Sequence, residues 1–213
     1  MNFFEIINKV LIELNYSPVA TFKDLTSLEH KRLMDIINRL NKDICNLNNN
    51  FTFRQMIKKI QLNPNKVEYK IPFVGKVSKV VGKNVVYEFE PDYTRFYYGN
   101  VGVNTYSFYG EKLLFSPSSE EIKIFYSTDE FVKTRNDELK SDFEEETDMS
   151  IIPDNFVEKL FINGVAYNFK QNVSHPKYNH WKQEYDKAIS ALLAYCKKNA
   201  NSNVIIDGGY RKL

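Results

Sequence analysis

The chain has 213 residues, with 29 Lys and Arg against 27 Asp and Glu, and 43% of its residues are apolar. This composition supports one compact body or two small ones and excludes a chain that is disordered throughout. A net charge of +2 is too close to neutral for a dedicated polyanion binder, so any contact with nucleic acid must be local. No apolar stretch is long enough to span a bilayer, and we expect a soluble, unsecreted protein without a membrane partner.

Cysteine and histidine are too few and too scattered to predict a disulfide framework or a metal site. Cys45 and Cys196 lie far apart in helical patterns, which indicates two buried thiols. His175 and His180 are five positions apart, which misses the spacing that sets two ligands on one helix face. We therefore expect no metal and no cofactor.

Two helices are predicted at the start of the chain. Asn2 with Glu5, and Thr26 with Glu29, match capping boxes that precede runs of apolar residues at helical spacing. Asn-rich residues then end the second helix, because Asn side chains compete for backbone hydrogen bonds. The predicted helices cover residues 3–15 and 27–46.

A β region follows, where the apolar period changes to two and short aromatic or β-branched runs alternate with Gly, Pro and Asn. Residues 82–84 and 110–111 supply hairpin turns. We expect a twisted antiparallel sheet. The predicted strands cover residues 53–62, 66–71, 76–81, 85–90, 94–98, 105–109, 112–116 and 121–126.

Residues 127–150 carry nine acidic against three basic residues, a net charge of −6, and few apolar residues to anchor them. Such a segment is typical of a mobile, solvated connection.

Two further helices are predicted after this segment. Pro153 and Asp154 open the first, which contains Gly164 at a position where a missing side chain allows close packing. The second starts after Pro176, carries Trp181 on its apolar stripe and ends near Asn199. The remaining tail contains an apolar triplet, Val204, Ile205 and Ile206, which suggests a docking strand.

The predicted fold class is α+β: an antiparallel four-helix bundle, with two N-terminal and two C-terminal helices, and an inserted twisted antiparallel β region. The predicted divisions are 1–50 for the first half of the bundle, 51–126 for the β insertion, 127–150 for the acidic linker, 151–199 for the second half of the bundle and 200–213 for the docking tail.

Catalytic patterns are missing from the sequence. The carboxylate groups at residues 144–146 and at Glu88 and Glu90 lie in a solvated stretch and beside a turn, whereas glycosidase carboxylates need a rigid cleft. No G-x-S-x-G serine, dinucleotide-binding loop or P-loop occurs. We therefore expect no enzyme.

An aromatic and basic run in the β region leaves one alternative open. Residues 51–126 hold 16 of the 30 Phe and Tyr residues and carry 11 basic against 7 acidic residues. Such a surface can stack single-stranded nucleic acid, although aromatic residues in a small sheet are more often core and lateral contacts. The run contains Tyr93, Arg95, Phe96, Tyr97 and Tyr98.

The chain resembles the head-to-tail adaptors of short-tailed bacteriophages, the tail tubular protein A family. Phe51 stands where that family usually has Trp, and the acidic segment 127–150 is longer than expected. The resemblance rests on the order helix, helix, β insertion, helix, helix and on these segments: Ile6–Tyr16 with Ser17, Pro18 and Val19; Thr21 and Leu25; Ile36–Leu47; Phe51–Phe53; Glu121–Tyr126; Ile152–Asp154 with Phe156; Ala166–Phe169; His175–Lys182; and Trp181–Leu193.

The resemblance implies a structural virion protein, assembled in the host cytoplasm. Twelve copies would form a ring beneath the portal protein and connect it to the tail nozzle protein, and double-stranded DNA would pass transiently through the centre. A ring needs contacts on two different faces of the subunit, and interface cores draw on exposed Phe and Tyr.

Three groups of residues are predicted to act in such an adaptor. An acidic group facing the channel would repel DNA phosphates, the aromatic and basic run would contact neighbouring subunits or the nozzle, and the tail would dock onto the portal. The groups are Glu144, Glu145 and Glu146; Tyr93, Arg95, Phe96, Tyr97 and Tyr98; and Val204, Ile205, Ile206, Tyr210, Arg211 and Lys212.

Overall fold

The computed structural model describes residues 1–172 and 174–207, with side chains as far as residue 199. The chain divides into a helical unit, Met1–Arg54 with Glu130–Leu213, and a β unit, Gln55–Asp129. The β unit therefore interrupts the sequence of the helical unit. The expected β insertion, 51–126, is close to this β unit, and residues from Glu130 onward, which include most of the expected linker at 127–150, belong to the helical unit.

Helix α1 (Phe3–Glu13) begins with the predicted capping box. The Asn2 side chain accepts a hydrogen bond from the backbone N–H of Glu5 at 2.8 Å, and the Glu5 carboxylate accepts one from the backbone N–H of Asn2 at 2.9 Å. These contacts satisfy two backbone N–H groups that a helix start leaves unpaired.

Helix α2 (Leu28–Asn46) begins one residue later than predicted, at the N-cap Ser27. The Ser27 hydroxyl accepts a hydrogen bond from the backbone N–H of His30 at 3.1 Å, so Ser27 replaces Thr26 in the capping role.

The Asn-rich segment after α2 holds a buried arginine. Arg54, at the end of the short 3-10 helix η2 (Thr52–Arg54), is 1% exposed. Its guanidinium donates to the Cys45 carbonyl at 3.0 Å and to the side-chain oxygens of Asn46 at 3.3 Å and Asn49 at 2.9 Å, and it lies over the Phe131 ring. Such a cation can be buried because its donors are satisfied.

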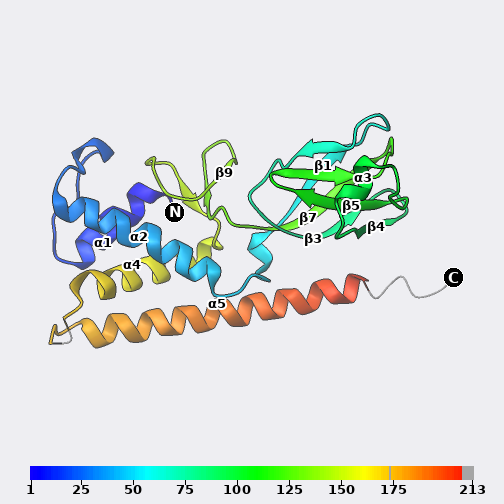
Figure 1. Ribbon diagram of the computed structural model, residues 1–213. Helices are drawn as coiled ribbons and strands as arrows, with labels where there is room; N and C mark the ends of the chain where they lie inside the picture. Colours follow the sequence, from blue (N-terminus) through cyan, green and yellow to red (C-terminus); the bar gives the residue numbers. More distant parts are fainter. Residues whose placement is uncertain (173, 208–213) are drawn as a thin grey trace. The chain divides into compact units, whose positions relative to one another are not determined.

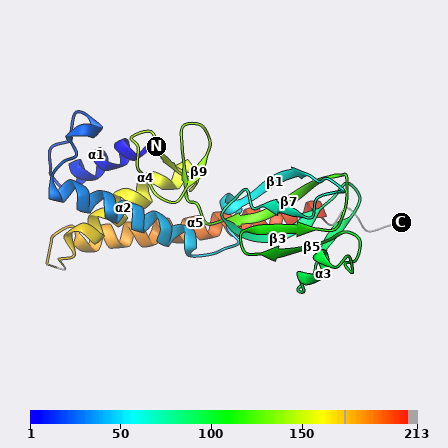
Figure 2. The same ribbon diagram turned by 45° about the horizontal axis from the view of Figure 1, so that its top comes forward.

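Helices α4 (Asp154–Lys170) and α5 (Tyr178–Asp207) complete the helical unit. Helix α4 packs against α1, α2 and α5 (Figure 1 and Figure 2). Close packing at Gly164 is confirmed, since a Cβ there would lie 2.7 Å from Leu40 Cδ2 and 2.8 Å from the Tyr185 ring. The predicted end of the last helix near Asn199 is wrong, because α5 continues to Asp207.

The acidic segment is folded. Strands β8 (Val132–Lys133), β9 (Leu139–Lys140) and β10 (Met149–Ser150) form a small sheet in the order β10-β8-β9. Phe131, Val132 and Phe143 are buried in the core of the helical unit, and Phe143 stacks on Phe3. The prediction of a solvated connection is therefore wrong: these few apolar residues are spaced so that they anchor the segment.

The β unit contains a seven-stranded sheet in the order β1-β7-β3-β4-β5-β6-β2, curled into a half-barrel. The side chains of Val80, Ile122, Ile124 and Phe115 form its core on the inner side. The strands are β1 (Gln55–Gln61), β2 (Glu68–Lys70), β3 (Gly75–Val81), β4 (Val86–Phe89), β5 (Thr105–Tyr109), β6 (Lys112–Phe115) and β7 (Glu121–Thr128).

The predicted strand at 94–98 is wrong, because these residues form the short helix α3 (Thr94–Tyr97). The Asp92 carboxylate accepts hydrogen bonds from the backbone N–H and the hydroxyl of Thr94, at 3.1 and 2.6 Å, and so favours a turn. The connection through α3 lets β4 pair with β5 in parallel.

These observations correct the predicted fold class. The chain is α+β, but its described part has five α-helices, and the β unit holds a seven-stranded mixed sheet instead of a small antiparallel insertion in a four-helix bundle. Periodicity did not predict the parallel β4–β5 pair or the sheet at β8–β10.

Candidate functional site

The most exposed aromatic surface of the described chain lies on α3 and β5. We name Tyr93, Tyr97, Tyr98 and Tyr109 the tyrosine patch. Tyr93 stacks on Tyr109 with ring centroids 4.8 Å apart, and Tyr97 meets Tyr109 edge-on at 6.3 Å. The Tyr98 side chain is 77% exposed. Exposed apolar surface of this density is typical of a protein contact.

Hydrogen bonds hold the patch in place. The Tyr97 hydroxyl donates to Glu68 Oε1 at 2.8 Å, and the same carboxylate pairs with Lys112. The hydrogen bond to Glu68 raises the pKa of Tyr97 to about 12, and the hydrogen bonds from Lys112 and Tyr97 lower the pKa of Glu68. At neutral pH the phenol is therefore protonated and the carboxylate ionised.

A second ion pair lies at the start of α3. Arg95 donates to Glu90 Oε2 at 2.9 Å. The Arg95 hydrogen bond lowers the pKa of Glu90, and the Thr94 hydrogen bonds lower the pKa of Asp92. Arg95 is thus matched by carboxylates on its own surface, and this reduces the attraction of the patch for phosphate.

Sequence reasoning found part of this surface. Tyr93, Arg95, Tyr97 and Tyr98 are exposed as the predicted contact role requires, but Phe96 is only 4% exposed and so is not available for such a contact. Tyr109 and Glu68 were missed. Tyr109 is the last residue of β5, beside the turn at Gly110, and the nearby turn was the available signal for an exposed residue.

The acidic group Glu144, Glu145 and Glu146 is exposed. Beneath it lies Asp148, which is fully buried, accepts hydrogen bonds from the backbone N–H groups of Glu144 and Glu145 at 2.7 Å, and pairs with Lys140 at 2.7 Å. Asp148 and Lys140, which the sequence did not single out, thus position the acidic group.

The predicted docking tail falls partly on helix. Val204, Ile205 and Ile206 lie within α5, so they do not form the predicted strand. Tyr210, Arg211 and Lys212 lie outside the described residues.

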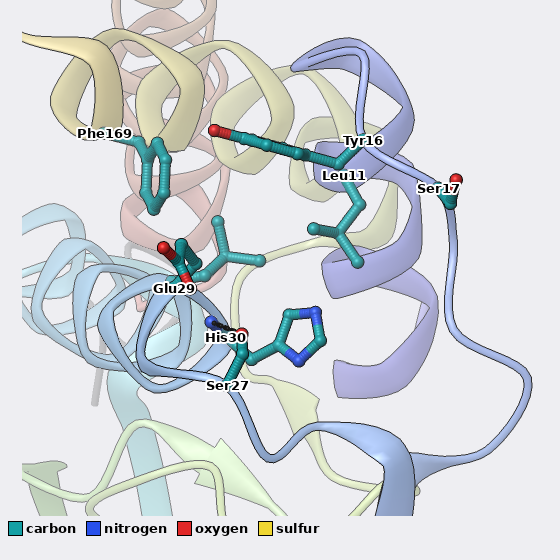
Figure 3. A pocket seen from close by; sticks show the side chains of 8 residues that line it. Leu11, Tyr16, Ser17, Ser27, Glu29, His30 and Phe169 are labelled. Atoms are coloured by element: carbon teal, nitrogen blue, oxygen red, sulfur yellow. Dashed lines mark hydrogen bonds between the residues drawn. The ribbon is translucent and has the colours of Figure 1, made fainter.

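A cavity of about 260 Å³ lies in the helical unit, beside the start of α2. Figure 3 shows the side chains of Tyr16, Phe169 and His30 around this space. His30 Nδ1 is buried without a hydrogen-bond partner in the described structure. The Ser27 hydroxyl caps α2, and within the described residues no serine hydroxyl is hydrogen-bonded to the His30 side chain. It is lined by Leu11, Tyr16, Ser17, Ser27, Glu29, His30, Leu33 and Phe169.

The described residues show neither a cluster of metal ligands nor an activated thiol. No group of three or more His, Cys, Asp or Glu side chains there could hold a metal ion. Burial raises the pKa of Cys45 to about 12 and also raises the pKa of Cys196, so neither thiol is activated. Within the same residues, no helix is long and apolar enough to cross a membrane.

Comparison of the sequence with protein-family models and with curated proteins found no match.

Proposed function

We propose that this chain is a structural virion protein, a head-to-tail adaptor that forms a ring between the portal protein and the tail nozzle protein of a bacteriophage. The tyrosine patch is the observation that carries the proposal, together with the resemblance of the sequence to that family. A densely aromatic, hydrogen-bonded and exposed surface suits a permanent protein contact better than it suits solvent. Twelve subunits would complete the ring if the resemblance extends to copy number.

The division into two units supports an adaptor role. The β unit interrupts the sequence of the helical unit, so one chain presents two separately folded bodies for two neighbours. A connector must contact different proteins at its two ends, and it needs rigid surfaces and no catalytic groups.

DNA would pass through the centre of the ring. In this proposal the exposed Glu144, Glu145 and Glu146 face the channel and repel phosphates, so the genome slides without binding. Residues after Asn199 would dock onto the portal.

Particle analysis tests the proposal. Mass spectrometry of purified particles of the virus that encodes the chain should find it in constant ratio to the portal protein. Cryo-electron microscopy should place its density in the neck. A chain that is abundant in infected cells but missing from purified particles would contradict the proposal.

A nucleic-acid-binding module is the second candidate, because cations gather on part of the β unit. Lys59 and Lys123 lie opposite each other on β1 and β7. A shift assay with single- and double-stranded DNA over a salt series tests this role, since binding by lysines weakens steeply as salt rises. In the adaptor proposal we expect only weak binding of either DNA.

A further inference from the structure

Four lysines share the outer side of the sheet at one end of the β unit. Ile122, Ile124 and Val80 point into the core, so their neighbours along each strand point outward. The register then groups Lys59 with Lys123, and Lys79 with Phe125 and Ile57, on the outer side. We name this surface the lysine face; it consists of Lys59, Lys76, Lys79 and Lys123 with Ile57 and Phe125.

The lysine face is short of counter-charge. Lys59 lies directly opposite Lys123, and like charges in that position destabilise a strand pair. Among the described side chains, Glu121 forms an ion pair with Lys59 at 3.4 Å, and none pairs with the other three lysines. Ile57, two positions from Lys59 on the edge strand β1, is 58% exposed. The surface therefore combines unmatched positive charge with apolar area.

The tyrosine patch lies toward the other end of the same sheet. Strands β1, β7 and β3 begin the sheet order, whereas β5, β6 and β2 end it. The carboxylates of Glu68, Glu90 and Asp92 contact the patch or the start of α3, and Glu88 lies two positions before Glu90. The nearby cations are Arg95, Lys112 and Lys70, which lies opposite Lys112. The patch thus offers aromatic rings and excess negative charge.

We propose that the lysine face of one copy of this chain docks onto the tyrosine patch of a second copy. Lysine ammonium groups bind both carboxylates and the faces of tyrosine rings, and Ile57 and Phe125 would cover exposed ring surface. Because the two surfaces differ and both belong to one β unit, the contact is head-to-tail and repeats from copy to copy. This inference rests on the proposed function only in assuming that the repeat closes into a ring.

A second copy fits the lysine face better than DNA does. Phosphate binding would satisfy the lysines but would leave Ile57 exposed and the tyrosine patch uncovered, whereas one contact between copies satisfies both surfaces. Binding of DNA to this face is the competing outcome in the experiment.

Paired charge-changing variants of the full chain test the contact. Lys79→Glu with Lys123→Glu alters the lysine face, and Glu88→Lys with Tyr98→Lys alters the patch without touching the hydrogen bonds that hold α3. In sedimentation velocity over a concentration series, each variant alone should self-associate at least about tenfold more weakly than the wild type.

Mixing the two variants distinguishes a head-to-tail contact from other modes. The mixture keeps one intact pairing, the unaltered lysine face of the patch variant on the unaltered patch of the lysine-face variant. We therefore expect the two variants to associate with each other when mixed, although each variant alone self-associates weakly. A chain that carries all four substitutions should regain part of its self-association, because the carboxylates introduced on the lysine face can pair with the ammonium groups introduced on the patch.

Carbodiimide cross-linking locates the contact. In a mixture of ¹⁴N- and ¹⁵N-labelled wild-type chains, Lys79 or Lys123 should couple to Glu88 in peptides that combine both labels. As a matched control, Lys31→Glu with Lys182→Glu makes the same charge change on exposed residues of the helical unit and should leave self-association unchanged.

Three results would overturn the inference: a wild-type chain that stays monomeric without these cross-links at the highest concentration, variants that assemble like the wild type, or a lysine-face variant that loses only its binding to a DNA duplex. Variants that enter particles normally would contradict this contact and leave the proposed function standing. Self-association through these faces by a chain that is missing from particles would contradict the function alone.

Discussion

Trp181 connects three parts of the helical unit through one side chain. It is 1% exposed, its indole N–H donates to Glu13 Oε1 at 2.9 Å, and its ring stacks on His175. Trp181→Ala should therefore cost about 3 to 5 kcal/mol of unfolding free energy, as large core truncations do. Urea denaturation measures it. Trp181→Phe, which keeps a ring but loses the hydrogen bond, should cost less, and equal melting of wild type and Trp181→Ala would contradict this packing.

Glu13 should make the stability of the helical unit depend on pH. Burial raises the pKa of its carboxyl, but hydrogen bonds from Trp181 and Lys177 outweigh burial and lower the pKa below the usual 4.5. The stabilisation is therefore complete above the unfolded-state pKa and is lost as pH falls through the lower folded-state pKa. In denaturation from about pH 7 to about pH 3, Glu13→Gln should be less stable than wild type at neutral pH, and the difference should shrink in acid. A constant difference would contradict this.

Arg54 shows why the candidate residues could be predicted only in part. The Asn-rich run was predicted to end the second helix, and α2 does end there. The amide oxygens of Asn46 and Asn49 also accept hydrogen bonds from the buried guanidinium of Arg54. Arginine residues are usually exposed, and no local sequence pattern indicates that distant residues will bury Arg54 and accept its hydrogen bonds. Asp148 escaped prediction for the same reason, because its burial depends on Lys140 and two backbone N–H groups.

Among the elements, α4 depends on Gly164 for its packing against α2 and α5. In an exposed helix, Gly→Ala adds about 1 kcal/mol of stability. At Gly164 the new Cβ would lie 2.8 Å from the Tyr185 ring, so Gly164→Ala should instead destabilise by about 1 to 3 kcal/mol. Thermal denaturation measures the change. Asn163→Ala, on the neighbouring and less buried position, should shift stability little, and a stabilising Gly164→Ala would contradict the close approach.

In the acidic segment 127–150, the exposed glutamates and the buried Asp148 should affect stability differently. Glu144, Glu145 and Glu146 are exposed, so changing all three to Gln should leave the melting temperature nearly unchanged. Asp148→Ala should cost about 3 to 5 kcal/mol, because it leaves two backbone N–H groups unpaired and removes the buried carboxylate partner of Lys140, which keeps only the exposed Glu144. Because the proposed function places the group in the channel, particles that carry the triple variant should eject DNA more slowly at low salt. Unchanged ejection across a salt series would place the group outside the channel.

The elements that the sequence predicted well are those with one dominant period. Helices α1, α2 and α4 follow from their apolar stripes and caps, and most strands follow from alternation. Residues 94–98 include three aromatic side chains, which favour a strand, yet the hydrogen bonds that Thr94 donates to Asp92 start a helical turn there. Strands β8–β10 have two residues each, which is too short for a hydrophobic period to be recognised. Their position depends on Phe131 and Phe143, which pack against residues distant in sequence.

At the scale of the whole molecule, the change in the spacing of apolar residues from helical to alternating predicted a separate β region. It did not predict the order of the strands in the sheet. Strands β1 and β7 pair although they enclose the rest of the β unit, and β4 pairs with β5 in parallel through α3. Such pairings depend on contacts between residues distant in sequence. The lysine face is likewise invisible in the sequence, because its lysines come from three strands that only the register brings together.

The extension of α5 to Asp207 changes how the end of the chain should dock in the proposed adaptor. Val204, Ile205 and Ile206 belong to a helix, so a portal groove would receive them as helix instead of adding them as a strand. A chain ending at Asn199 should keep the fold of the helical unit, lose a little helical circular dichroism and bind portals at least about tenfold more weakly. Val204→Asp with Ile206→Asp in the full-length chain should weaken binding similarly while its helix signal falls less than after truncation. Portal binding by the truncated chain as tight as that of the full chain would assign docking to the rest of the helical unit or to the β unit.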